Sequence, residues 1–383
     1  MEVRVSIEPM NIWSRDFNTS CSFHLRENSV AIFMEKEDAE MIDDLQAFFH
    51  YPSYRPARRS VWTVYLYRDT AADMFLTGKS EKINMELGET GKLIVTGKYT
   101  VIESDATKGI VVIDSKSKVV SIYNPRYKVR FIDAYRVVRQ LFATQLLEHS
   151  IPFHGGAVHL EGINIAFLGH KGFGKSTLVT GLLYKNPTSS YICNDRFFLK
   201  VLPGHPAEIV QWPECPALTY TTLCMFEELP DRIEYMKHHP GRFVPSERFI
   251  DHPRLPGKQE IISNRTDEGK VIFTNLEFTS MLRRSIMPST SLDYIFLLSR
   301  PENNECELVP ISDTETMQLL NKNIDAFDSF PDWLNIQGKR NHNIDLAAVR
   351  DFPQCFLFRR TYNLEYDLAF LKEWALDRFL DKK

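Results

Sequence analysis

The sequence lacks several features that would assign it to a structural class at once. It has only six cysteines, spread along the chain with no Cys-x-x-Cys pair, which predicts buried reduced thiols instead of a zinc site or a disulfide framework. No segment approaches the roughly 18 consecutive apolar residues of a membrane span. The first residues alternate charged and apolar side chains, so they lack the apolar core of a secretion signal. We therefore expect a cytoplasmic protein.

An excess of positive charge is also missing. The chain has 46 lysines and arginines against 50 aspartates and glutamates, and its formal net charge is -4. Proteins that bind nucleic acid or acidic membranes generically need a basic excess. We expect neither partner here, and the sequence leaves the oligomeric state open. With 43% hydrophobic and 25% charged residues, the composition is typical of a globular protein with a substantial core.

Residues 1–128 are predicted to form a β-rich N-terminal domain. Short runs of alternating apolar and polar residues recur there, separated by turn residues such as Asn124-Pro125, and they predict strands at 3–7, 61–67, 92–95, 109–113 and 119–123. An acidic, helix-like segment at 36–49 interrupts the pattern. Because this part contains no catalytic constellation, we expect a sheet that packs on or shapes the second domain.

Residues 129–383 are predicted to form an α/β domain. Apolar residues at three- and four-residue spacing predict an amphipathic helix at 130–150. Two apolar strands follow at 156–160 and 163–168, and a short strand is expected at 191–193. Further strands are predicted at 196–202, 208–212, 271–273, 292–298 and 306–309, and helices at 175–184, 217–229, 314–324 and 365–380. The polar, Pro- and Gly-rich segment 231–257 is typical of a lid or a binding loop.

The second predicted strand leads directly into a phosphate-binding motif. It matches G-x-x-x-x-G-K-[ST] and comprises Gly169, His170, Lys171, Gly172, Phe173, Gly174, Lys175, Ser176 and Thr177. Its glycines allow the backbone N–H groups to point inward at phosphate oxygens, and the following helix adds the positive end of its dipole. The lysine can reach the β and γ phosphates, and the serine hydroxyl can hold Mg²⁺. The motif predicts binding of a nucleoside triphosphate.

Two further residues are candidates for chemistry. Asp195 follows the strand 191–193, and if that strand lies beside the one that precedes the loop in a parallel sheet, Asp195 should face the phosphates. It would then serve as a general base or a metal ligand. His154 precedes two glycines that allow another group to approach closely. Taken alone, however, an aspartate at a strand end is more often a turn or cap residue, and such a histidine more often packs in a core.

Three stretches in this order resemble the HPr kinase/phosphorylase family, whose relatives are small-molecule and peptide kinases distantly related to phosphoenolpyruvate carboxykinases. They are His154-Gly155-Gly156-Ala157-Val158, the loop Gly169–Thr177, and Asn194-Asp195. The resemblance covers residues 153–212 and, more loosely, the rest of the second domain. It implies an HPr-kinase-like P-loop fold preceded by the β-rich domain, with ATP and Mg²⁺ as cofactors.

The resemblance also implies individual roles. His154 corresponds to the histidine near the transferred phosphate, Lys175 to the phosphate-binding lysine, Ser176 to the metal-bound hydroxyl, and Asp195 to the acid that acts as base on the acceptor. Asn194 stands where the family has its first aspartate, so the metal site of Ser176, Asn194 and Asp195 loses one charge, although the amide oxygen can still coordinate. The family has a second sequence motif that serves dephosphorylation, and this chain has no clear match to it. HPr is therefore not the expected substrate.

The sequence therefore predicts an ATP- and Mg²⁺-dependent kinase. Its acceptor would be a hydroxyl on a small molecule or on a peptide or protein serine. The alternative is a nucleotide-binding regulator or sensor with little or no transfer, suggested by Asn194 and the added β-rich domain. Trp212 is a candidate for flanking the pocket or for the core, and the candidates for stabilising the transferred phosphate are Lys258, Arg283, Arg284 and Arg300.

Overall fold

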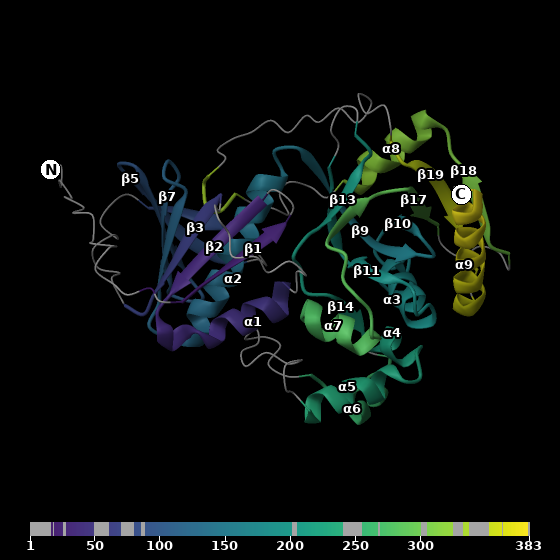
Figure 1. Cartoon of the computed structure of the whole chain (residues 1–383), viewed down its shortest axis with the longest axis horizontal. Helices are drawn as coiled ribbons and strands as arrows, with labels where there is room; N and C mark the ends of the chain where they lie inside the picture. Colours follow the sequence, from purple (N-terminus) through teal and green to yellow (C-terminus); the bar gives the residue numbers. More distant parts are fainter. Residues whose placement is uncertain are drawn as a thin grey trace. The chain divides into compact units, whose positions relative to one another are not determined.

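The computed structural model describes residues 17, 19–25, 28–49, 61–69, 80–85, 89–200, 205–239, 255–266, 269–299, 305–324, 332–336, 352–361 and 363–381. The chain divides into two compact units (Figure 1). The first comprises Met1–Leu45, Ser53–Gln145 and Asp328–Arg340, and the second comprises Gln46–Pro52, Leu146–Phe327 and Asn341–Lys383. The predicted domain boundary at residues 128 and 129 falls inside helix α2 (Tyr127–Leu146) and stays a prediction.

The first unit is built on a mixed sheet with the strand order β1-β2-β3-β8-β7-β6-β5-β4 among the described residues. Its strands are β1 (Thr19–Leu25), β2 (Asn28–Met34), β3 (Trp62–Tyr67), β4 (Glu81–Asn84), β5 (Thr90–Thr96), β6 (Tyr99–Ser104), β7 (Ile110–Asp114) and β8 (Val119–Tyr123). β3 runs parallel to both β2 and β8, and the other neighbours are antiparallel. Four predicted strands are confirmed as β3, β5, β7 and β8, and the one at 3–7 lies outside the described residues.

Two helices belong to this part of the chain. The acidic segment forms a short 3₁₀ turn, η2 (Lys36–Asp38), followed by α1 (Glu40–Phe49), as predicted. The amphipathic helix expected at 130–150 is present as α2, which ends at Leu146, and all of its charged side chains except Lys128 are buried as well as most of its apolar ones. Arg130 and Asp38 are fully buried and form an ion pair at 2.6 Å. Internal pairing of this kind offsets the desolvation of the charges, so a one-sided apolar stripe is not required.

The second unit contains a larger mixed sheet with the order β16-β13-β12-β9-β10-β17-β19-β18 and with β11 paired to β9. The strands are β9 (Ser150–Leu160), β10 (Ile163–Leu168), β11 (Ser190–Cys193), β12 (Arg196–Lys200), β13 (Glu208–Gln211), β16 (Ser289–Ser291), β17 (Tyr294–Leu298), β18 (Glu307–Pro310) and β19 (Gln354–Arg359). β17 is parallel to β10 and to β19, whereas β9 is antiparallel to β10, β11 and β12. A separate ribbon pairs β14 (Ala217–Thr219) with β15 (Lys270–Ile272).

The helices of this unit are α3 (Lys175–Lys185), α4 (Tyr220–Cys224), α5 (Leu229–His238), α6 (Lys258–Ser263), α7 (Asn275–Leu282), α8 (Asp313–Asn323) and α9 (Leu364–Asp381). Two predictions need correction. The helix expected at 217–229 begins as strand β14 and continues as the short α4, and the loop expected at 231–257 is helical up to His238. Residues 240–254 of that segment lie outside the described residues.

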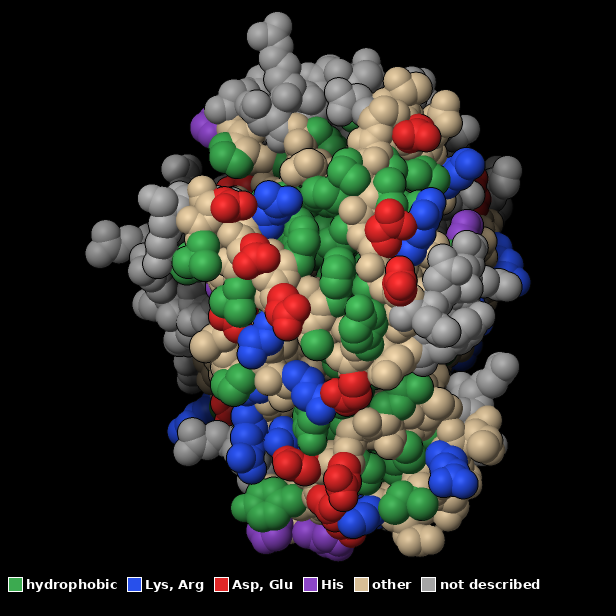
Figure 2. Space-filling view, turned by 90° about the vertical axis from the view of Figure 1, so that its right-hand side faces the viewer, with side chains coloured by type: hydrophobic (Ala, Val, Ile, Leu, Met, Phe, Trp, Pro, Cys, Tyr) green, Lys and Arg blue, Asp and Glu red, His purple; other side chains and the backbone are tan. Residues whose placement is uncertain are grey.

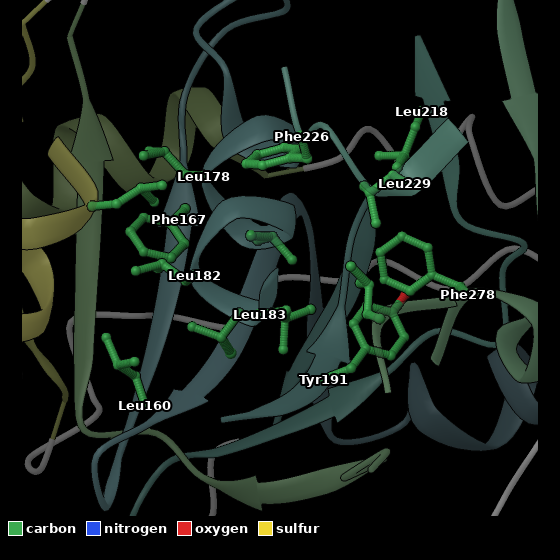
Figure 3. Close-up of a cluster of buried hydrophobic side chains, with 14 of the residues drawn as sticks. Leu160, Phe167, Leu178, Leu182, Leu183, Tyr191, Leu218, Phe226, Leu229 and Phe278 are labelled. Atoms are coloured by element: carbon green, nitrogen blue, oxygen red, sulfur yellow. The ribbon is translucent and has the colours of Figure 1, made fainter. Parts of the chain in front are cut away.

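Apolar side chains cover both faces of the larger sheet because successive strand residues point to opposite faces. On β10, Ile165 and Phe167 join one core cluster, and Ala166 and Leu168 join another. Figure 3 shows the first cluster, in which Phe167 lies beside Leu178 and Leu182 of α3. This packing fixes α3 against the sheet and thereby fixes the loop that precedes the helix.

The surface is mixed in character on the face drawn in Figure 2. Lysine and arginine side chains there are interspersed with aspartates and glutamates, and apolar side chains form a band between them. Within the described residues, no helix is long and apolar enough to cross a membrane.

Candidate active site

The loop between β10 and α3 has the backbone that its glycines predict. Gly169, Gly172 and Gly174 have φ values of 151°, 87° and 80°, a region that side chains of other residues strongly disfavour. Gly174 is the N-cap of α3, and Lys175 is its first residue. The Lys175 Nζ donates to the carbonyl of Gly169 at 2.6 Å and to that of His170 at 3.3 Å. The lysine therefore folds back over the loop.

Lys175 is buried, with 7% of its surface exposed. Burial lowers the pKa of its ammonium group because a charge is poorly solvated there, and the positive charge of Lys270 lowers this pKa further. The carboxylate of Asp195 acts in the opposite direction and raises the pKa. Asp195 and Lys270 thus influence the Lys175 ammonium group in opposite directions.

The strand arrangement that positions Asp195 differs from the predicted one. β10 and β11 are not neighbours, because β9 lies between them and is antiparallel to both. Because β9 is antiparallel to both of them, β10 and β11 run in the same direction and end at the same edge of the sheet. The expectation of adjacent parallel strands is wrong, and the orientation of Asp195 toward bound phosphates stays a prediction.

His154 lies within β9, so the prediction that it precedes the strand pair is wrong. Gly155, its neighbour, is paired with Leu168, the last residue of β10, which brings His154 next to the start of the loop. The His154 Nδ1 is 3.6 Å from the Asp195 Oδ1, and the Gly155 N–H donates to the Asp195 carbonyl at 2.8 Å. Both side chains are about 40% exposed, at 39% and 42%, and so are open to a substrate.

The two glycines after His154 allow the close approach that the sequence suggested. A Cβ on Gly156 would lie 2.8 Å from a methyl group of Val179 in α3 and 3.4 Å from the carbonyl oxygen of Asn194. A Cβ on Gly155 would meet Leu168 at 2.6 Å. A larger residue at Gly156 would push α3 or the end of β11 away from β9, and one at Gly155 would press on β10.

Asn194 has a feature suited to a cation. It is 3% exposed, and its amide nitrogen donates to the Ala217 carbonyl at 3.5 Å. Its buried Oδ1 has no hydrogen-bond partner among the described residues. Amide and carboxylate oxygens and hydroxyls are hard ligands that suit Mg²⁺. The described residues contain no cluster of three or more His, Cys, Asp or Glu side chains that could hold a metal alone, so Mg²⁺ here would need Asn194, Asp195, Ser176 and phosphate oxygens.

Sequence reasoning missed Arg360, which directly follows β19. It is 8% exposed, its Nη1 donates to the carbonyl of Phe173 in the loop, and its Nε donates to the buried Asp367 at 3.0 Å. Asp367 also accepts a hydrogen bond from the Sγ of Cys306 at 3.0 Å. An apolar run that ends in two arginines (Cys355 to Arg360) was the available signal, since it indicates a buried strand with a cation at its carboxyl end.

Most of the other predicted candidates lie elsewhere. Arg284 donates to the carbonyls of Leu183 and Tyr184, at the end of α3 opposite the loop, and Lys258 pairs with Asp231. Trp212 is buried against Phe198 as a core residue. Arg300 is outside the described residues, and no contact of Arg283 with the loop is found in the described part of the chain.

The comparisons with known proteins add a distant likeness. No protein-family model matches the chain, and no curated protein matches it. Among solved structures, it is similar to the HPr(Ser) kinase/phosphatase from Coxiella burnetii, with 11% sequence identity and a TM-score of 0.27, covering 60% of this chain and 95% of that chain. This similarity is at most one of fold, and it does not assign a family.

Proposed function

We propose that the chain is an ATP- and Mg²⁺-dependent kinase that transfers the γ-phosphate to a hydroxyl group of a small molecule or of a peptide or protein serine. The observation that carries this proposal is the meeting of Lys175 and the His154–Asp195 pair at one edge of the sheet. Phosphoryl transfer depends mainly on positioning and on neutralising charge, and these groups offer both.

The loop supplies the nucleotide contacts in this proposal. The N–H groups from His170 to Thr177 and the amino end of α3 would hold the phosphates, and the Nζ of Lys175 would turn from the loop carbonyls to the β and γ phosphates. Ser176, Asn194 and Asp195 would hold Mg²⁺, which neutralises phosphate charge when bound.

Asp195 would act as the general base. The acceptor oxygen attacks the γ-phosphorus, the bond from that phosphorus to the β–γ bridging oxygen breaks, and the acceptor proton passes to the Asp195 carboxylate. ADP and the phosphorylated acceptor are the products. His154, at 3.6 Å from Asp195, would orient the carboxylate and, when protonated, would offset negative charge on the transferring phosphoryl group.

A transfer assay tests this proposal. Pure protein is incubated with γ-labelled ATP, Mg²⁺ and free serine or serine-containing peptides. At saturating Mg²⁺ and nucleotide, Asp195→Asn should lower kcat by about 100-fold or more, the usual contribution of a positioned base. Asp43→Asn, at an exposed position of α1, is the matched control and should leave the rate unchanged. Transfer by Asp195→Asn at the wild-type rate would rule out Asp195 as the base.

A nucleotide-binding regulator remains the second candidate, and the neutral Asn194 favours it. Such a protein would bind ATP without releasing ADP when an acceptor is added. Asn194→Asp provides a sharper comparison, because an added carboxylate strengthens a hard-cation site. If the wild-type chain is a kinase limited by its metal site, this variant should transfer phosphate at lower Mg²⁺ concentrations. If the chain is a regulator, neither protein should transfer label.

A further inference from the structure

The β14–β15 ribbon brings a second lysine to the candidate active site. β15 begins at Lys270, which is the register partner of Thr219 in β14, and the neighbouring pair is Val271 with Leu218. Val271 and Leu218 are both buried in the core cluster. Because side chains alternate along a strand, Lys270 and Thr219 occupy the opposite face of the ribbon.

Contacts at two points attach the ribbon to the site. The Asn194 amide nitrogen donates to the Ala217 carbonyl of β14 at 3.5 Å. At the other end of β14, the Thr219 Oγ1 accepts from the Thr222 backbone N–H at 3.1 Å, and the Thr222 hydroxyl lies 3.1 Å from that of Thr177 in the first turn of α3. The ribbon thus joins the end of β11 to the beginning of the loop helix.

The charge of Lys270 is uncompensated by an ion pair within the described part of the chain, and its side chain is exposed. Its positive charge also acts on Lys175, whose Nζ donates to two loop carbonyls and is influenced in the opposite sense by the Asp195 carboxylate. Two ammonium groups near the same loop suit a bound polyanion, because each can donate a charge-assisted hydrogen bond to a phosphate oxygen.

We propose that Lys270 contacts the γ-phosphate of the bound nucleotide from the ribbon, opposite Lys175. The inference rests on the proposed function, because it needs a triphosphate in the loop. Lys270 would bind the terminal phosphate that distinguishes ATP from ADP, whereas the loop amides bind phosphates that both nucleotides share. It would therefore contribute to discrimination between the two nucleotides and to neutralising charge during transfer.

Calorimetric titration of the full chain in Mg²⁺ tests this, with ADP and the β,γ-imido analogue of ATP as probes. Lys270→Met should weaken binding of the analogue by about fivefold or more and binding of ADP by less than about twofold, as loss of one charge-assisted contact predicts. Lys270→Arg should stay within about twofold of wild type for both, because the charge remains. Lys92→Met, at an exposed strand position in the first unit, is the matched control and should change neither affinity.

Equal weakening of the binding of both nucleotides, or no weakening of either, would overturn the proposal. If Lys270→Met does not fold, Lys270→Arg still tests the proposal. A change in the relative affinities for the two nucleotides in the arginine variant would contradict a contact that depends on charge alone. If the wild-type chain binds neither nucleotide, the proposed function fails together with this inference. If the wild type binds and transfers phosphate while Lys270→Met matches it, only this inference fails.

Discussion

The guanidinium of Arg360 occupies the space that a side chain at Gly174 would need. A Cβ on Gly174 would lie 2.3 Å from the Arg360 Nη1. The arginine is not free to move aside, because its Nε is held at 3.0 Å by Asp367, which is fully buried. The conformation of the loop is therefore fixed partly by its own glycines and partly by a residue from the far end of the chain.

Gly174→Ala tests this relationship. Its penalty should include both the strain of a φ of 80° and the clash with Arg360, whereas Gly97→Ala, at a φ of 58° with no heavy atom within 4 Å, should show the strain alone. We expect a loss of about 1 kcal/mol in unfolding free energy for Gly97→Ala and about 2 kcal/mol more for Gly174→Ala. Denaturant titration measures both, and the loop variant should also lose nucleotide affinity.

A double-mutant cycle with Arg360→Met identifies the cause. If the arginine produces the clash, Gly174→Ala should cost less stability in the Arg360→Met background than in the wild type, because the space is then vacated. Equal costs in the two backgrounds would show that backbone strain alone explains the penalty.

Lys175→Met should change how stability depends on pH. Burial lowers the pKa of Lys175 in the folded chain, so the folded state holds this proton less strongly than the unfolded state does, where the pKa is about 10.4. Below the pKa of the folded state, the buried charge lowers the free energy of unfolding by its full amount. This loss of stability disappears as the pH rises to the pKa of the unfolded state. The free energy of unfolding of the variant minus that of the wild type should therefore fall as the pH rises toward about 10.4, the pKa of the unfolded state. A difference that stays constant as the pH rises to this value would mean that the pKa is not lowered.

Asp133 should make the first unit less stable at neutral pH than at acidic pH. Burial raises the pKa of its carboxyl to about 7, and the Thr107 hydroxyl and nearby arginines oppose this only partly. The folded state thus holds the proton more strongly than the unfolded state, whose pKa is about 3.9. Its contribution to stability is complete below that value and is lost as the pH rises through about 7.

Asp133→Asn removes this titration. Thermal unfolding should show the variant gaining stability relative to wild type as the pH rises from 4 to 7.5. Asp114→Asn is a suitable control, since the pKa of Asp114 is lowered and its carboxyl is ionised throughout the upper part of that range. The control difference should be flat from pH 5 to 7.5, and a flat difference for Asp133→Asn as well would show that its carboxyl is ionised in the folded chain.

The features that could be predicted are local in sequence. The β9–β10 hairpin and the loop with its helix follow from apolar alternation and from glycines at fixed spacing, which report on the backbone within a few residues. The meeting of His154 with Asp195 was expected from a resemblance, although the strand arrangement used to rationalise Asp195 was wrong. No local pattern distinguishes two parallel neighbours from two strands separated by an antiparallel third.

The features that the sequence did not predict depend on contacts between segments that are far apart in the chain. Arg360 contacts Phe173, which is 187 residues away, and Lys270 reaches the site only because β15 pairs with β14. Buried charges such as Arg130 also contradict the periodicity rules, because an arginine within a helix normally indicates a solvent-facing side. Its partner, Asp38, lies 92 residues earlier, and no spacing rule connects them.

The separate stretch Asp328–Arg340 belongs to the first unit, and within it Trp333 and Leu334 are buried. During synthesis on the ribosome, this piece emerges only after the chain up to residue 327 has been made. The first unit therefore lacks these buried residues until the chain has been translated past Leu334. A gene fragment that ends at Gln145 would encode the first unit without the stretch Asp328–Arg340.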